Sequence, residues 1–352
     1  MSASFPVAPL VAAGLVASAL LLGALVARAT RRSSRAGHRQ RTAQVMRALS
    51  GALSGSVTSE ALRSAAGEAE AEQFWDAIEA ITSTLRRRER LALAASLERN
   101  RHVVAERRTL ARDDSPVRRE RAARRLGLLP TPRMRAALRH ALVGGPEPVR
   151  MAAARSLSVL RDLAALDWIC THPEALASRP LPALSGLMRA FGPGARSRLI
   201  IALDRGIAVT RVECAIVDAL GVSRCRSARE RIELRLRGDA VDVRVAAARA
   251  LGRLGMGEAI PALILALQDA AWPVRAQAAQ ALGRLRATPA VDAVAERVAD
   301  PVWWVRHHAA YALAGMGHEG HDALCELVVR SPDAYAREMA REALDHGVAR
   351  SA

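Results

Sequence analysis

The sequence predicts an all-α protein in which one transmembrane helix precedes a solenoid of stacked helix pairs. Three observations support this fold class. Over half of the 352 residues are apolar but only 3% are aromatic, and the dominant alanine and leucine favour closely packed helices over sheets. An uncharged apolar segment opens the chain, and the second half repeats itself at a constant period. The chain is long for one compact core, but an elongated array has no such limit.

The N-terminal segment is long enough to cross a bilayer. Residues Ser2 to Ala27 carry no charge, and from Val7 onward they are almost all Ala, Val, Leu and Gly. A membrane helix needs roughly 20 apolar residues. The small-x-small pattern Ala27-Arg28-Ala29 leaves a cleaved signal peptide as the alternative. The segment lacks the basic start of a signal peptide and exceeds its usual apolar length, so the sequence favours an uncleaved anchor.

Arginines flank only the C-terminal side of this segment. Six of them and no acidic residue lie within residues 28–41, so the positive-inside rule places the remaining chain in the cytoplasm, at the inner membrane. The same arginines would attract anionic lipid headgroups by about 1 kcal/mol each, although a plain stop-transfer flank explains them equally well. These membrane-proximal residues are Arg28, Arg31, Arg32, Arg35, Arg39 and Arg41.

Composition divides the chain into four parts. Residues 1–29 form the predicted anchor, and residues 30–57 form a basic juxtamembrane segment and a flexible linker rich in serine and glycine. Residues 58–110 are predicted as the helical, arginine-rich start of the array, and residues 111–352 as the repeat solenoid itself.

Positive charge is concentrated near the N-terminal end. All 52 basic residues are arginine, because the sequence has no lysine, and the net charge is +17. Residues 86–140 alone hold seventeen arginines against six acidic residues. A solvated helical face near the membrane explains this stretch, and acidic protein partners are the alternative. The stretch has no interleaved aromatic residues, so the sequence does not favour a nucleic acid partner.

The strongest signal is the internal repeat, whose period is the constant spacing of Arg244, Arg275, Arg306 and Arg337. Apolar residues in each copy fall at i, i+3, i+4 and i+7, which is one face of a helix. First helices are predicted at residues 259–267 and 291–298, with prolines near their starts. Second helices are expected to end at Gly221, Gly252 and Gly283. Copies begin at Arg119, Val149-Arg150, Leu181, Val212-Glu213, Val243-Arg244, Val274-Arg275 and Val305-Arg306, with a degraded copy at Arg337.

These residues resemble the HEAT repeat in the short bacterial form of phycobilisome bilin lyases, over roughly residues 110–347. In that family an aspartate before the second helix pairs with an arginine along the stack. Asp239 and Asp333 are offset by a residue or two, so irregular ends are expected. The resemblance implies a structural ladder made of Asp269, Asp300, Arg244, Arg275, Arg306 and Arg337.

Enzyme motifs are missing from the sequence. It contains no GxxxxGK, GxSxG or HExxH, so we expect no enzyme activity, cofactor or metal. The alternatives are HEAT-scaffold enzymes, namely a bilin lyase or a metal-dependent hydroxylase similar to deoxyhypusine hydroxylase, which uses several His-Glu pairs. Only His318-Glu319 matches, on an expected loop, and one dipeptide does not supply a metal site. Four isolated cysteines are predicted as core thiols, namely Cys170, Cys214, Cys225 and Cys325.

Partner binding is predicted at three tryptophans. Trp272 and Trp303 are separated by one repeat period and Trp304 follows, so we expect them in equivalent loops on one rim of the stack. Tryptophan is enriched at the energetic centres of interfaces, and packing beneath a neighbouring loop is the alternative. The predicted function is a membrane-anchored, cytoplasm-facing scaffold or adaptor for a protein partner. Similarity to single-pass bacterial HEAT proteins further implies envelope or polysaccharide machinery.

Overall fold

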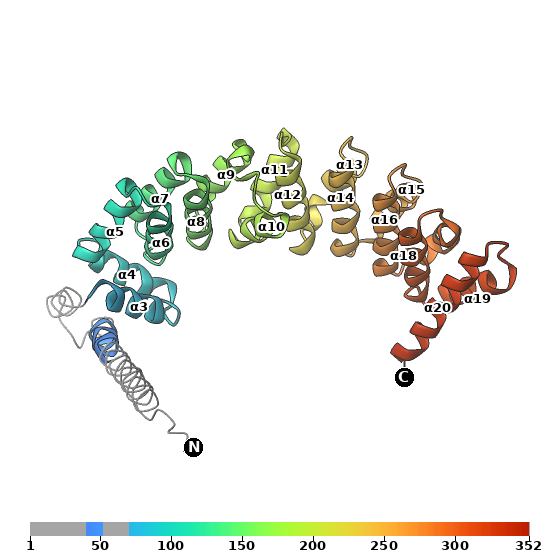
Figure 1. Ribbon diagram of the computed structural model, residues 1–352, viewed down its shortest axis with the longest axis horizontal. Helices are drawn as coiled ribbons and strands as arrows, with labels where there is room; N and C mark the ends of the chain where they lie inside the picture. Colours follow the sequence, from blue (N-terminus) through green and yellow to red (C-terminus); the bar gives the residue numbers. More distant parts are fainter. Residues whose placement is uncertain (1–39, 52–69, 352) are drawn as a thin grey trace, which may run out of the picture. The chain divides into compact units, whose positions relative to one another are not determined.

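The computed structural model describes residues 40–51 and 70–351, and the chain divides into two compact units, Met1–Ala137 and Leu138–Ala352. Every regular element in the described ranges is a helix (Figure 1), which confirms the all-α class. The predicted anchor, residues 1–29, lies outside these ranges. Among the helices that are described, none is both long and apolar enough to span a membrane.

The first unit is built from helices with clear local start signals. The Asn100 side chain accepts a hydrogen bond from the His102 backbone N–H at the start of α5, and Ser115 caps α6 ahead of a proline. The predicted division at residues 110 and 111 falls in the last turn of α5, which packs against α6. The helices are residues 40–51, α3 (Ala71–Thr82), α4 (Arg87–Leu97), α5 (Arg101–Arg112), α6 (Pro116–Leu126) and α7 (Pro132–Gly144), which crosses the unit boundary.

The second unit repeats a pair of helices. The first helices are α9 (Leu163–Thr171), α11 (Ala195–Arg205), α13 (Arg229–Arg235), α15 (Ile260–Ala266), α17 (Val291–Glu296) and α19 (His318–Arg330). The second helices are α8 (Glu147–Val159), α10 (Leu181–Ala190), α12 (Thr210–Val222), α14 (Val241–Leu254), α16 (Trp272–Leu285), α18 (Trp303–Ala314) and α20 (Ala334–Ser351). Short 3₁₀ turns join them: η1 (Pro173–Leu176), η2 (Arg226–Ala228), η3 (Gly257–Ala259), η4 (Thr288–Ala290) and η5 (Arg297–Ala299).

The helix pairs of this unit stack in two layers (Figure 1). Each of α12, α14 and α16 packs against the next second helix along the chain, and the first helices cover one side of this layer. The contact surfaces are small apolar residues: Ala247, Leu251, Ala278 and Leu282 are fully buried. Small side chains let successive backbones approach, so each pair buries its apolar face on the next. The repeat solenoid predicted from the constant period is therefore confirmed.

Three glycines do not end the second helices, so that prediction was wrong. Gly221, Gly252 and Gly283 lie inside α12, α14 and α16, where each faces the following second helix. A Cβ added to Gly283 would lie 2.7 Å from the Ala312 Cα, and one added to Gly252 would lie 2.9 Å from the Ala281 Cα. These glycines are points of close helix contact, where no side chain fits.

The helices α14 and α16 end slightly later, at left-handed residues. Gly255 closes α14 with φ 72° and Arg286 closes α16 with φ 51°. A left-handed residue after a helix lets backbone N–H groups bond back into the final turn, which satisfies its last carbonyl groups. The glycine of the sequence pattern therefore precedes the true end of each helix by most of one turn.

Candidate partner-binding surface

The predicted ladder joins three consecutive repeats. The Arg244 Nε and Nη2 atoms donate to the two carboxylate oxygens of Asp269 at 2.7 and 2.9 Å. Arg275 binds Asp300 in the same way, at 2.8 and 2.9 Å. The remaining nitrogen of each arginine donates to carbonyl oxygens in the loop before its own helix, such as Asp269 O at 2.9 Å from Arg275. Each arginine therefore ties a second helix both to its own loop and to the next repeat.

Within the described chain, Arg306 has no carboxylate partner that would continue the ladder. Arg306 Nη1 donates to the Asp300 and Pro301 carbonyls at 2.9 and 3.2 Å, while its buried Nε has no partner. One repeat beyond Asp300 the residue is serine, and the guanidinium instead lies 5.2 Å from the centre of the Tyr335 ring. Arg337 likewise bonds only loop carbonyls, at 2.7 and 3.1 Å.

The ladder carboxylates are stabilised in their charged form. Burial would raise the pKa of Asp300, but the Arg275 hydrogen bonds, the Val302 backbone N–H and nearby arginine charge outweigh it and hold the pKa below its usual value. The pKa of Asp269 is held low for the same reasons, with Arg244 and the Ala271 N–H as partners. The Arg275 and Asp300 side chains are only 13% and 1% exposed, so this ion pair is largely buried.

The three tryptophans occupy helix starts rather than loops, which corrects the sequence prediction. Trp272 is the first residue of α16, and Trp303 and Trp304 are the first two of α18. Asp269 and Asp300 stand three residues before Trp272 and Trp303, and each accepts the backbone N–H two residues on, at 2.8 and 2.9 Å, in the loop just before the helix. The three tryptophans are 42%, 45% and 52% exposed, whereas Trp75 in the first unit is 2% exposed.

Stacked rings hold the α18 tryptophans in place. The Trp303 ring stacks on His307 at a centroid distance of 4.9 Å, and His307 contacts Tyr311 at 4.4 Å, one helical turn further on. Trp304 lies edge-to-face against Trp303 at 4.7 Å and stacks on His308. Burial, together with the neighbouring His307, lowers the pKa of His308, so the His308 ring is an uncharged partner for Trp304 at neutral pH.

Two further residues extend this surface and were missed from the sequence. Val241 is 39% exposed at the first position of α14, and Tyr335 is 66% exposed at the second position of α20. Val241 stands one repeat period before Trp272, and Tyr335 stands one period after Trp304. Both positions could therefore have been found in the sequence by counting one repeat period before and after the tryptophans. We define the apolar rim as Val241, Trp272, Trp303, Trp304 and Tyr335.

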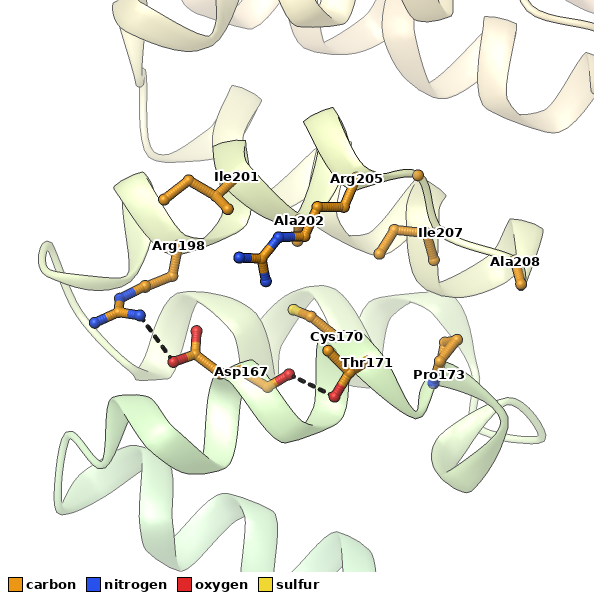
Figure 2. A pocket seen from close by; sticks show the side chains of 11 residues that line it. Asp167, Cys170, Thr171, Pro173, Arg198, Ile201, Ala202, Arg205, Ile207 and Ala208 are labelled. Atoms are coloured by element: carbon orange, nitrogen blue, oxygen red, sulfur yellow. Dashed lines mark hydrogen bonds and ion pairs between the residues drawn. The ribbon is translucent and has the colours of Figure 1, made fainter.

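A cleft between α9 and α11 holds a cysteine beside an ion pair (Figure 2). Its volume is about 240 Å³, and an ion pair of 3.0 Å between Arg198 and Asp167 crosses it. Cys170 lines the cleft, but burial and the Asp167 charge raise the pKa of its thiol to about 12. A thiol with that pKa is not a thiolate at neutral pH and is a poor nucleophile.

The remaining candidate residues are scattered. His318 and Glu319 lie in the first turn of α19 rather than in a loop. In the described parts of the chain no three His, Cys, Asp or Glu side chains gather closely enough to hold a metal. Cys214 and Cys225 are buried, but Cys170 is half-buried and Cys325 is exposed, so the prediction of core thiols was wrong for Cys325.

Arg41 is the only predicted membrane-proximal residue within the described chain. It forms an exposed ion pair of 3.6 Å with Glu70, which contributes little to stability. Part of the arginine-rich stretch is structural: Arg125 bonds Glu106 and Glu72 at 2.6 and 2.5 Å and lies over the Trp75 ring. The other five predicted membrane-proximal arginines lie outside the described ranges; they are Arg28, Arg31, Arg32, Arg35 and Arg39.

This geometry defines a helical-repeat solenoid with an exposed apolar rim and HEAT-like repeats. Residues 228–314 and 260–345 match the HEAT repeats family profile. No curated protein matches the sequence significantly.

Solved structures with a similar fold include two enzymes and a larger protein. Human deoxyhypusine hydroxylase with glycerol is 16% identical over 90% of this chain and 99% of its own (TM-score 0.31). The CpcE–CpcF complex of phycocyanin lyase from Nostoc sp. is 22% identical over 77% and 94% (TM-score 0.27). Kap121p is 12% identical over 88% and 42% (TM-score 0.48). These similarities concern the fold alone.

Proposed function

We propose that this chain is a membrane-tethered scaffold that binds a protein partner along the apolar rim. The observation that carries the proposal is the exposure of Trp272, Trp303 and Trp304, at 42%, 45% and 52%, on the same edge of consecutive repeats. Tryptophans of this kind serve as anchors in interfaces because they bury a large area with few rotatable bonds. A partner lying along the stack contacts several repeats at once.

The rim is also prepared for binding by its supporting contacts. Trp303 and Trp304 are held against each other and against His307, so little side-chain freedom is lost when a partner covers them. Arg306 lies over the Tyr335 ring at 5.2 Å and fixes the far end of the rim. A rigid, half-exposed aromatic row favours a binding role over a catalytic one.

The tether in this proposal is the uncharged segment from Ser2 to Ala27, followed by arginines. We place the repeat array in the cytoplasm at the inner membrane, with envelope or polysaccharide machinery as the source of partners. A reporter enzyme fused after Ala352 should be active in the cytoplasm. Activity on the periplasmic side, or a mature chain starting at Thr30, would contradict the tether.

Photo-crosslinking in cells tests the binding surface directly. A photoreactive residue placed at Val241 or Tyr335 of the full-length chain should crosslink one discrete protein from both positions. The same residue at Val159, which is 64% exposed on α8, is the matched control and should not crosslink that protein. The crosslink should disappear when Trp272 and Trp303 are replaced by alanine. Equal crosslinking from Val159, or a crosslink that survives the double replacement, would refute the rim.

A further inference from the structure

One repeat position in the second unit adopts left-handed backbone in every copy from α8 to α18. It lies just after the second helix, and arginine and glycine alternate there along the chain. The six residues and their φ values are Arg161 (54°), Gly192 (82°), Arg224 (47°), Gly255 (72°), Arg286 (51°) and Gly317 (81°). Within residues 40–51 and 70–351, these arginines are the only non-glycine residues with positive φ.

Arginine is poorly suited to this backbone conformation. A Cβ disfavours left-handed φ, and glycine occupies the same position in the neighbouring repeats without that strain. The guanidinium groups of Arg224 and Arg286 have no hydrogen-bond or ion-pair partner in the described chain, so they do not compensate the strain by intramolecular contacts. Strained residues persist where the side chain has another use.

Arg224 lines a cleft between successive repeats, and Arg286 holds the same position two repeats further on. The volume of the cleft is about 530 Å³. Gly221 and Gly252 line it, and their lack of side chains lets α12, α14 and α16 approach one another near their C-terminal ends. The cleft is lined by Gly221, Val222, Arg224, Arg226, Gly252, Arg253, Leu254, Gly255 and Arg284.

The cleft is strongly positive. Four arginines line it and no acidic residue does. Of the four, only Arg253 is paired within the described chain: it bonds Asp218, which also accepts a hydrogen bond from Ser185 and so holds Arg253 in place. Within the described chain, Arg224, Arg226 and Arg284 keep their guanidinium donors free. Guanidinium groups bind carboxylates through paired, charge-assisted hydrogen bonds.

We propose that this cleft, together with Arg286, which lies two residues after the lining residue Arg284, binds an acidic, Asp/Glu-rich segment of a protein in extended conformation. Neighbouring helices pack about 8–10 Å apart, so Arg224 and Arg286 are roughly 16–20 Å apart, which about five or six extended residues span. Positive charges two repeats apart, on either side of Gly255, fit an extended peptide better than a flat membrane surface. The cleft lies at the C-terminal ends of helices of about 20 Å length, away from the apolar rim at their start, and is therefore a second site.

Replacement by glycine provides a direct test. The double variant Arg224→Gly/Arg286→Gly removes two guanidinium groups and supplies the residue that the backbone prefers, so its melting temperature should be unchanged or higher. A fluorescent ten-residue peptide of glutamates should bind the full-length chain at low salt, and the variant should bind it at least tenfold more weakly. A four-residue peptide, too short to span two repeats, should bind less well.

The controls separate the alternatives. Arg196→Gln/Arg341→Gln removes two exposed arginines outside the cleft and should bind the peptide like the parent chain, as should Trp272→Ala/Trp303→Ala, which tests the rim instead. Equal loss in the Arg196/Arg341 variant would show unspecific charge attraction and overturn the site. Unchanged binding by the glycine variant would also overturn it, as would its melting at lower temperature, because the arginines would then be structural. The parent chain could also bind anionic vesicles or single-stranded DNA more strongly than the peptide. If the glycine variant lost that binding, the cleft would belong to another class of partner and the proposal would be overturned.

Discussion

Arg275 makes four hydrogen bonds in the ladder: two to the Asp300 carboxylate and two to loop carbonyls, of which the closer is 2.9 Å long. The family resemblance implied an aspartate–arginine ladder but left open whether Asp269 or Asp300 is the carboxylate partner of Arg275; the structure shows Asp300. The lack of a carboxylate partner for Arg306 in the described chain was foreseeable from the sequence, because Asp333 is displaced by two residues from the repeat position. Side-chain pairing along a repeat is set by register, and sequence alone contains only part of that register.

Replacing Arg275 by alanine should destabilise the second unit by about 1–3 kcal/mol, because the Asp300 carboxylate, 1% exposed, loses its partner. Arg306→Ala is the matched control: it removes the same kind of carbonyl bonds but orphans no carboxylate, so it should cost clearly less. Chemical denaturation of the parent and both variants measures the difference. Equal destabilisation by the two replacements would show that the carboxylate pair adds nothing.

Acid should weaken the array through the same pairs. The pKa values of Asp269 and Asp300 are lowered in the fold, so their contribution is fully present above the unfolded value of about 3.9 and is lost as pH falls through the lower folded values. The free energy of unfolding should therefore drop steeply below about pH 4. Asp300→Asn should lower stability at neutral pH and make this drop shallower. An identical pH dependence in the variant would contradict the role of the pair.

At the scale of the helix, the sequence placed each second helix correctly but misjudged its ends. Gly252 is a stop signal by residue type, yet it lies within α14 against Ala281, and the helix ends at Gly255. The tryptophans were placed in loops because aromatic side chains carry no start signal, and neither α16 nor α18 has a side-chain cap that would mark its first residue. In the sequence, a glycine that ends a helix cannot be distinguished from a glycine that allows a neighbouring helix to pack closely, because the packing partner is not known.

Gly283→Ala should destabilise the array by about 1–3 kcal/mol, because the new methyl group would lie 2.7 Å from the Ala312 backbone and force α16 and α18 apart. Gly186→Ala in the middle of α10 is the control. Its Cβ would meet only the end of the Arg189 side chain at 3.9 Å, so the gain in helix propensity should stabilise by up to about 1 kcal/mol. The melting temperature should therefore fall in Gly283→Ala and rise in Gly186→Ala. A Gly283→Ala variant as stable as the parent would mean that the helices adjust freely.

At the scale of the whole molecule, the constant repeat period was enough to predict the solenoid, because each repeat buries its apolar face on the next and the pattern records that burial. The binding surfaces were only partly predictable. Trp272 and Trp303 stand out by residue type, whereas the exposure of Val241 and the strained backbone of Arg224 depend on how the helices end and stack. The membrane segment, by contrast, rests on the sequence alone.

The affinity of the rim for its partner is the most direct test of the scaffold function. Once the protein crosslinked at Val241 and Tyr335 is identified, its dissociation constant should be measured for the full-length chain and for Trp272→Ala/Trp303→Ala, together with thermal stability. The variant should melt like the parent and bind at least about 2 kcal/mol more weakly, as expected when interface anchors are truncated. The control Val143→Ala/Val159→Ala removes two exposed apolar side chains, 54% and 64% exposed, from α7 and α8 and should bind normally. A tryptophan variant that folds and binds with unchanged affinity would contradict the proposal, and one that unfolds would show that the rings belong to the core.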